Sequence, residues 1–290
     1  MAASAAPLGR VLAQGRPTTG PVEQLAALER RHGGRLGVAI LDTNDGRRIN
    51  HRGEQRFPMC STFKWLAAAL VLARVDRGEE QLDRRVVFTR DDLVTYSPVT
   101  GLHIGEPGMT MGELCHAAVT LSDNTAGNLL LASFGGPAGL TAFARSLGDT
   151  MTRLDRIEPE LNEATPGDPR DTTTPAMMLA NMRALLVGDA LSAASHAQLI
   201  EWLVASTTGG KRLRAGLPSN WRVGDKTGTG EKGVTNDVAI LWPPGRGPLL
   251  VTAYYAEMVA TPEQRNAVLA DVGRIAAGLR GPGRTSAADT

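Results

Sequence analysis

Residues 222–256, RVGDKTGTGEKGVTNDVAILWPPGRGPLLVTAYYA, carry the main sheet signal of the chain. They contain three runs of β-branched, aromatic and other apolar residues, and glycines and prolines separate these runs. Such a pattern is typical of strands joined by tight turns. We therefore expect three consecutive strands, at 222–229, 234–242 and 249–256.

The amino-terminal part of the chain adds a hairpin to this sheet. Apolar residues dominate 36–43, Asn44-Asp45-Gly46 is a typical hairpin turn, and 47–50 returns as a second strand. Apolar residues at helical spacing mark 22–32, which stops at a pair of glycines, and 262–279 near the other end of the chain. Both ends of the chain thus contribute a helix and strands.

The centre of the chain is mainly helical. Helical patterns occur at 61–77, 110–118, 124–134, 176–186 and 195–204. A helical middle between sheet-forming ends predicts an α+β fold, with a sheet domain built from both ends of the chain and a helical domain inserted between them. We expect the sheet domain at 22–56 and 206–280, the helical domain at 57–205, and disordered segments at 1–21 and 281–290.

Composition and charge exclude several classes of protein. A formal net charge of +1 without a basic run gives no basis for binding nucleic acid or a membrane surface. No apolar stretch approaches the roughly 20 residues of a membrane span, and 1–21 lacks the charged and apolar regions of a secretory signal. The five histidines lack metal-ligand spacing, so we expect no metal. Cys60 and Cys115 are not expected to pair.

Ser61-Thr62-Phe63-Lys64 is the first of three short motifs with chemical potential. The serine begins an apolar helix, where unpaired backbone N–H groups and the helix dipole favour negative charge. Lys64 follows one turn later on the same face. Only four of the 31 basic residues are lysines, and a buried lysine can lose its proton, whereas an arginine cannot. Lys64 can therefore activate Ser61 for attack on a carbonyl. A capping serine followed by a solvated lysine is the ordinary alternative.

Two further motifs, Ser122-Asp123-Asn124 and Lys226-Thr227-Gly228, lie far along the chain. The first begins a predicted helix, and capping alone would explain its composition. In the second, a lysine and a glycine interrupt a strand, which is unusual. Gly228 would let a substrate backbone approach closely, and Lys226 would attract a carboxylate. An exposed edge strand remains the alternative for this motif.

Residues 153–175 break every periodic pattern. They contain four prolines and little apolar content. A stretch of this length without secondary structure is usually either functional or disordered. Opposite charges within it, Arg156 and Asp171 among them, favour an ordered Ω-type loop.

In this order and spacing, the three motifs resemble those of the penicillin-recognising serine enzymes, which comprise the serine β-lactamases and the penicillin-binding proteins. The sequence Arg-Ile-Glu-Pro-Glu-Leu-Asn at 156–162, together with 168–171, resembles the Ω-loop of class A serine β-lactamases. The resemblance spans about residues 22–279. It implies an α+β fold (an α/β sandwich) with an antiparallel sheet flanked by the N- and C-terminal helices, an inserted all-helical domain, and the active site between them.

The resemblance also implies catalytic roles. Ser61 would open the β-lactam ring and form an acyl-enzyme, with either Lys64 or Glu158 as the base for acylation, the latter through a water. Ser122 would pass a proton to the departing ring nitrogen. Glu158 and Asn162 would then activate the water that hydrolyses the acyl-enzyme.

Substrate binding is implied for a second group of residues. Its members are Asn124, Asn162, Lys226, Thr227, Gly228, Thr229, Arg212 and Tyr96. The backbone N–H groups of Ser61 and Thr229 would form the oxyanion hole. Relatives place an arginine at one of two positions near the substrate carboxylate. Because one of these positions is Thr235 here, Arg212 is the candidate. Structural roles fall to an Arg156–Asp171 ion pair at the neck of the loop and to a cis Glu158–Pro159 bond.

The implied activity is hydrolysis of penicillins and cephalosporins, and hence antibiotic resistance, without a metal or organic cofactor. The resemblance further implies a monomer in the periplasm or outside the cell. A D-alanyl-D-alanine peptidase would share the three motifs but should lack the Glu158 and Asn162 loop. A penicillin-sensing domain that is acylated without turnover is the other alternative.

Overall fold

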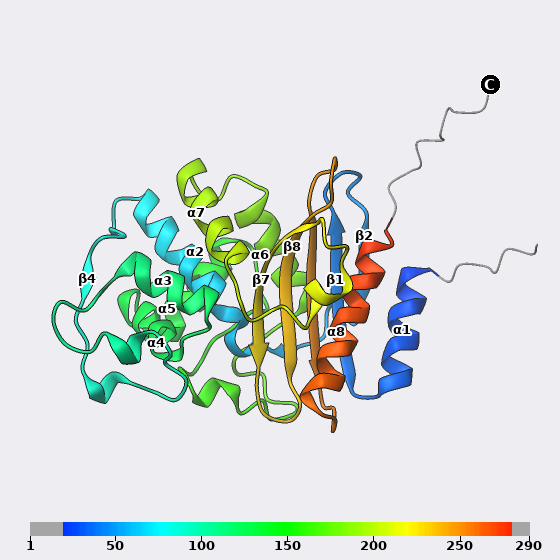
Figure 1. The fold of residues 1–290 in the computed structure, drawn as a ribbon, viewed down its shortest axis with the longest axis horizontal. Helices are drawn as coiled ribbons and strands as arrows, with labels where there is room; N and C mark the ends of the chain where they lie inside the picture. Colours follow the sequence, from blue (N-terminus) through cyan, green and yellow to red (C-terminus); the bar gives the residue numbers. More distant parts are fainter. Residues whose placement is uncertain (1–19, 280–290) are drawn as a thin grey trace, which may run out of the picture.

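The structure is a computed structural model that describes residues 20–279, and a five-stranded antiparallel sheet lies within it (Figure 1). The strands of this sheet are β1 (Arg35–Asp42), β2 (Arg48–His51), β7 (Arg222–Thr229), β8 (Thr235–Trp242) and β9 (Leu249–Ala256). Their order across the sheet is β2-β1-β9-β8-β7, so the two ends of the chain meet where β1 pairs with β9. The predicted α+β fold is confirmed, and each predicted strand agrees to within one residue at either end.

Both faces of this sheet are covered. The helices α1 (Pro21–His32) and α8 (Pro262–Ala277) pack side by side over one face, and the helical part of the chain covers the other (Figure 1). Successive residues of a strand point to opposite faces. Accordingly, Val38 packs in the core beneath α1 and α8, whereas Ala39 packs in the core shared with the helical part. Every residue of β9 is buried as a consequence.

The middle of the chain forms a group of helices around α2. Their bounds are α2 (Phe63–Asp76), α3 (Met111–Thr120), α4 (Asn124–Ser133), α5 (Gly136–Ser146), α6 (Pro175–Leu186) and α7 (Ala193–Val204). α2 is buried from Phe63 to Ala73, as expected for a helix that is apolar on all sides. Thr110 and Glu113 form the expected capping box of α3. The sequence pattern misses α5, because the glycine pair that ends α4 also begins α5 without a polar cap.

Two short ribbons are also absent from the sequence prediction, because two-residue strands carry no periodicity. β3 (Phe57–Pro58) pairs with β6 (Thr172–Thr173), and β4 (Arg85–Val86) pairs with β5 (Met109–Thr110). The first ribbon matters for function. It attaches the end of the irregular segment 153–175 to the residues that lead into Ser61.

Segment 153–175 is the ordered loop that its charges predict. Its regular structure consists of a 3₁₀ turn, η4 (Glu160–Asn162), of β6 and of an isolated bridge between Arg153 and Thr172, before α6 begins at Pro175. The Glu158–Pro159 peptide bond is cis, which confirms the expectation from the resemblance. The Glu106–Pro107 bond outside the loop is cis as well.

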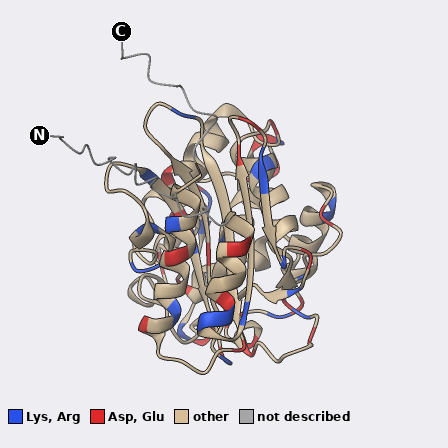
Figure 2. Ribbon diagram, turned by 90° about the vertical axis from the view of Figure 1, so that its right-hand side faces the viewer, with Lys and Arg blue, Asp and Glu red and all other residues tan. Residues whose placement is uncertain are grey.

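The disorder predicted for 1–21 and 281–290 lies outside the described residues, except at Gly20 and Pro21, which are the N-cap and first residue of α1. Both cysteines are free and buried. Basic and acidic residues are interspersed over the helices and strands in view in Figure 2. Within residues 20–279, no helix combines the length and the apolar character needed to cross a membrane.

Candidate active site

Ser61 lies in a 3₁₀ turn, η1 (Cys60–Thr62), that leads directly into α2. The residue before it, Cys60, has φ of +46°, in the left-handed region that non-glycine residues seldom adopt. One turn later, Lys64 places its Nζ 2.8 Å from Ser61 Oγ. Both side chains are buried, so the serine and the lysine of the first motif meet inside the protein.

Lys64 is surrounded by hydrogen-bond acceptors. Its Nζ donates to Ser122 O at 2.9 Å and to Asn124 Oδ1 at 2.6 Å, and it lies 2.9 Å from Glu158 Oε1. Burial lowers the pKa of Lys64, and the neighbouring Glu158 carboxylate opposes this effect. The lysine therefore releases its proton more readily than an exposed lysine would.

Glu158 extends from the loop to the other side of the serine and is fully buried. Its Oε1 accepts a hydrogen bond from Ser61 Oγ at 3.0 Å, and its Oε2 accepts one from Asn162 Nδ2 at 2.5 Å. Asn128 of α4 fixes the main chain of Glu158, because its side chain accepts from Glu158 N at 2.8 Å and donates to Glu158 O at 2.9 Å. The carboxylate is thus held in one orientation beside the serine.

Arg156 and Asp171 join the two ends of the loop. Arg156 Nε donates to Asp171 Oδ2 at 2.6 Å. The other oxygen, Asp171 Oδ1, accepts from the backbone N–H groups of Asp155 and Arg156 at 2.8 and 2.9 Å. Met59, two residues before Ser61, donates its N–H to Asp171 O at 2.9 Å. The neck of the loop is therefore tied to the turn that carries the serine.

The second motif divides between two roles. Asp123 caps α4, since its Oδ1 accepts from Ala126 N at 2.8 Å, so the capping interpretation holds for this residue. Ser122, at φ of +61°, and Asn124 instead line the cleft. Asn124 Nδ2 donates to Thr95 O at 2.8 Å, which leaves its Oδ1 directed at Lys64.

The third motif lies on β7, an edge strand of the sheet, yet its residues are buried. Lys226 is fully buried, and its Nζ donates to Ser122 Oγ at 2.9 Å and to Thr227 O at 2.7 Å. Burial is the main cause that lowers the pKa of Lys226 well below its usual range, and the positive charges of Lys64 and Arg212 add to it. The exposed-edge interpretation is therefore wrong for this lysine.

A cleft of about 350 Å³ lies where these elements meet. It is lined by Ser61, Tyr96, Ser122, Asn124, Asn162, Thr208, Arg212, Thr227 and Thr229. Arg212 donates to Gly228 O at 2.8 Å, to Asn236 O at 2.6 Å and to Thr229 Oγ1 at 2.6 Å. Tyr96 is 57% exposed, and its carbonyl accepts from Asn124 N at 3.0 Å. Residues far apart in the sequence thus share one cleft.

Sequence reasoning missed two residues of this site. Thr208 lines the cleft and shares a 2.7 Å hydrogen bond with Thr227 through their hydroxyls, a contact between distant segments that no local pattern reveals. Asn128 could have been found, because it follows Asn124 by four residues on the same helix and therefore shares its face.

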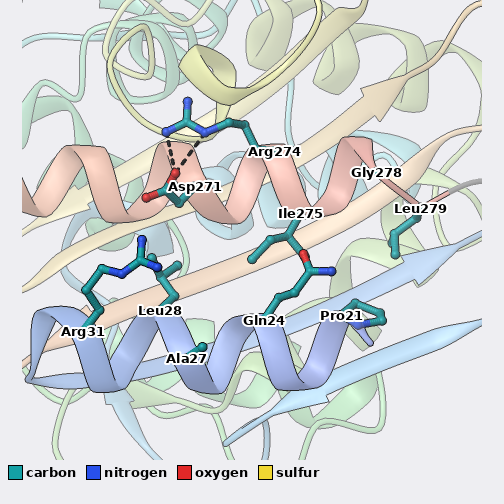
Figure 3. Close-up of a pocket in the computed structure, with 10 residues that line it drawn as sticks. All are labelled: Pro21, Gln24, Ala27, Leu28, Arg31, Asp271, Arg274, Ile275, Gly278 and Leu279. Carbon is teal, nitrogen blue, oxygen red and sulfur yellow. Dashed lines mark hydrogen bonds and ion pairs between the residues drawn. The ribbon is translucent and has the colours of Figure 1, made fainter. Parts of the chain in front are cut away.

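A second hollow, of about 450 Å³, lies between α1 and α8 (Figure 3). Leu28 and Ile275 are among its walls, and both belong to the layer on the opposite face of the sheet from Ser61. Arg274 forms an ion pair with Asp271 along α8, as the dashed lines in Figure 3 show. This hollow is remote from the three motifs.

Comparison with known proteins identifies relatives of this chain. Residues 20–278 match the Beta-lactamase enzyme family. Beta-lactamase OXY-2 of Klebsiella oxytoca is 48% identical over 278 residues, which are 95% of either chain. Beta-lactamase L2 of Stenotrophomonas maltophilia is 51% identical over 257 residues, which cover 88% of this chain and 84% of the relative.

Solved structures extend the comparison to three dimensions. An ancestral (GNCA) class A beta-lactamase matches with a TM-score of 0.87 and 67% identity, covering 88% of this chain and 98% of the other. The last common ancestor of Gram-negative bacteria (GNCA4) beta-lactamase class A matches with a TM-score of 0.86 and 65% identity, at 88% and 97% coverage. The chain therefore belongs to the beta-lactamase enzyme family and is a class A serine β-lactamase, a hydrolase of β-lactams.

Proposed function

We propose that this enzyme hydrolyses penicillins and cephalosporins through an acyl-enzyme on Ser61. The observation that carries the proposal is the contact of one buried hydroxyl with two bases. Ser61 Oγ lies 2.8 Å from Lys64 Nζ and 3.0 Å from Glu158 Oε1. Either group is close enough to accept the proton as Oγ attacks the β-lactam carbonyl. The C–N bond of the ring then breaks.

Ser122 is the group that we assign to the departing nitrogen. Its hydroxyl lines the cleft with Ser61 and accepts a hydrogen bond from Lys226. A hydroxyl in contact with an ammonium can give its proton to the ring nitrogen and receive one from the lysine. The backbone N–H groups of Ser61 and Thr229 form the oxyanion hole in this proposal.

Deacylation is assigned to Glu158 and Asn162. The two side chains are 2.5 Å apart, and Asn162 Oδ1 is buried without a hydrogen-bond partner among residues 20–279. A water held by both groups would lose its proton to Glu158 and attack the ester carbonyl. The bond between the carbonyl carbon and Ser61 Oγ would then break, and Oγ would take up the proton. This step separates a β-lactamase from the peptidase and the penicillin sensor, which the comparisons do not favour.

Binding of the substrate carboxylate is assigned to the wall formed by Thr227, Thr229 and Arg212. The guanidinium of the half-buried Arg212 contacts Thr229 Oγ1, so it supplies positive charge at this end of the cleft. A side chain on Gly228 would meet Met59 O, so this glycine brings the strand close to the turn of Ser61. Asn124 holds the side-chain amide of the substrate, and Tyr96 borders the mouth.

The remaining expectations also belong to the proposal. Family membership supports a monomer in the periplasm or outside the cell that confers resistance to β-lactam antibiotics. We also assign a sheet domain to 22–56 and 206–280 and a helical domain to 57–205, with the cleft between the two. The cleft's lining residues, which come from both parts of the chain, support this division. The ion pair of Arg156 with Asp171 keeps the loop, and with it Glu158, in position.

Nitrocefin turnover combined with mass spectrometry of the protein tests the mechanism. We expect steady hydrolysis by the unmodified enzyme and a trapped adduct on Ser61 in Glu158→Ala. Glu160→Ala, an exposed carboxylate of the same loop, serves as the matched control and should turn over normally. An unmodified enzyme that stops after one equivalent of nitrocefin would overturn the hydrolytic mechanism.

A further inference from the structure

A buried amide on β8 connects the strand of the third motif with the turn of the first. Asn236 pairs with Gly228 in the register of β7 and β8, and its side chain is fully buried. Its Nδ2 donates to Pro58 O at 2.8 Å and to Met59 O at 3.1 Å. These two carbonyls lie immediately before the residues that form η1.

The contacted carbonyls belong to the same turn as the nucleophile. Met59 O also accepts from Thr62 N at 3.2 Å and from Thr62 Oγ1 at 2.8 Å, and Ser61 lies inside this turn. A Cβ atom on Gly228 would stand only 2.6 Å from Met59 O. The strand and the turn are therefore in direct contact, and the amide of Asn236 lies at the junction.

The orientation of this amide points to its role. Asn236 Oδ1 is buried and has no hydrogen-bond partner within the described part of the chain. Rotating the amide would place that oxygen against two carbonyl oxygens, which would repel it. Buried polar atoms rarely lack a partner. The Asn236 side chain donates to both carbonyls and leaves its own oxygen unpaired. We conclude that its N–H groups, and not its oxygen, account for the asparagine at this position.

We propose that Asn236 is a positioning residue that sets the separation between the two N–H groups of the oxyanion hole, those of Ser61 and Thr229. One group belongs to the turn that Asn236 holds, and the other follows Gly228, its partner across the strands. Arg212 Nη1 donates to Asn236 O at 2.6 Å, so the main chain of Asn236 is fixed as well. The inference rests on the acyl-enzyme mechanism proposed above.

Removal of the amide should misalign the hole without changing any group that touches the substrate. We expect Asn236→Leu, which keeps the branching at Cγ, and Asn236→Ala, which adds no bulk, to lower kcat/KM roughly tenfold to a hundredfold. Asn181→Leu is the matched control. Asn181 is another buried asparagine with an unpaired Oδ1, but it lies on α6 and donates to Asp149.

Infrared spectroscopy of the trapped acyl-enzyme measures how strongly the oxyanion hole hydrogen-bonds the ester carbonyl. In the Glu158→Gln background, a penicillin labelled with ¹³C at the β-lactam carbonyl gives one ester band, whose frequency rises as its hydrogen bonds weaken. We expect Asn236→Leu and Asn236→Ala to shift this band to higher frequency or to broaden it on its high-frequency side. Asn181→Leu should leave the band in place, even if this substitution lowers the melting temperature of the protein as much as the Asn236 substitutions do.

The outcomes separate this inference from the mechanism. An unchanged band in both folded Asn236 variants, with kcat/KM within twofold of the unmodified enzyme, would overturn the positioning role and leave the mechanism intact. If neither the unmodified enzyme, quenched during turnover, nor the Glu158→Gln protein carries an adduct on Ser61, the acyl-enzyme mechanism fails, and the inference fails with it. An adduct on the unmodified enzyme alone would identify Glu158 as the base for acylation, and the band is then measured on that adduct. Melting curves establish that each variant is folded at the temperature of measurement.

Discussion

The ammonium of Lys226 lies 2.9 Å from the hydroxyl of Ser122, so the third motif contacts the second inside the protein. The composition of the strand suggested that Lys226 would face a substrate carboxylate. It is instead fully buried, and its other hydrogen bond goes to the carbonyl of the next residue. Its charge therefore acts on the cleft through Ser122.

Lys226→Met should slow the opening of the β-lactam ring, because the Ser122 hydroxyl loses the ammonium that can return its proton. Loss of proton transfer of this kind typically costs at least about 100-fold, and we expect a decrease of that order in kcat/KM for penicillins. Lys226→Arg keeps the charge in a crowded position and should lose less activity. Equal activities of the two variants would contradict a role for the charge.

Asp171→Asn should loosen the loop. The substitution removes the charge that Arg156 contacts, although one amide oxygen can still accept from the backbone. Breaking a buried ion pair typically costs roughly 3 kcal/mol of folding free energy. Because the loop carries Glu158, we expect deacylation to slow more than acylation, so that acyl-enzyme accumulates during turnover.

Stopped-flow measurement of penicillin turnover, with mass spectrometry of quenched samples, follows this accumulation. Asp271→Asn on α8 removes an i, i+3 ion pair with Arg274 far from the loop and should leave both steps unchanged. Unaltered turnover and melting temperature in Asp171→Asn would count against the importance of the Arg156–Asp171 pair.

Asp237→Asn should stabilise the protein at neutral pH. Asp237 is buried on β8, where Oδ2 accepts from Leu213 N at 3.1 Å and Oδ1 has no hydrogen-bond partner within residues 20–279. Burial is the main cause that raises its pKa well above the ordinary 3.8, and the Asp225 carboxylate adds to this, while Arg212 and Arg214 oppose it. The fold therefore favours the protonated form.

The sign of the pH dependence follows from that preference. A raised pKa gives a stabilising contribution that is fully present below pH 3.8 and is lost as the pH rises through the folded pKa. Since the substituted amide would keep the hydrogen bond from Leu213 without ionising, melting temperatures should rise by at least about 2 °C at pH 7 and converge near pH 4. A constant difference across this range would contradict the assignment.

Local patterns predicted the strands, most helices and the three motifs, because these depend on neighbours in the sequence. Thr110 with Glu113 shows this, since a capping box is complete within four residues. The contacts of Lys226 and Asn236 could not be predicted, because the first depends on the packing of β7 against Ser122 and the second on the packing of β8 against the turn at Ser61. Roles for Glu158 and Asn162 came from resemblance alone, since an irregular loop has no period from which to place a side chain.

Gly228→Ala should disrupt the junction between β7 and the nucleophile turn. The added Cβ would lie 2.6 Å from Met59 O and 3.1 Å from Thr62 Cγ2, so strand and turn must separate. Such a shift displaces the N–H group of Thr229 relative to Ser61, and we expect kcat/KM to fall on the order of 100-fold. Gly210→Ala is the matched control, because a Cβ there meets no atom within 4 Å. Full activity of both variants toward penicillins would contradict this prediction. The close approach of β7 to the turn at Gly228 would then have no part in catalysis.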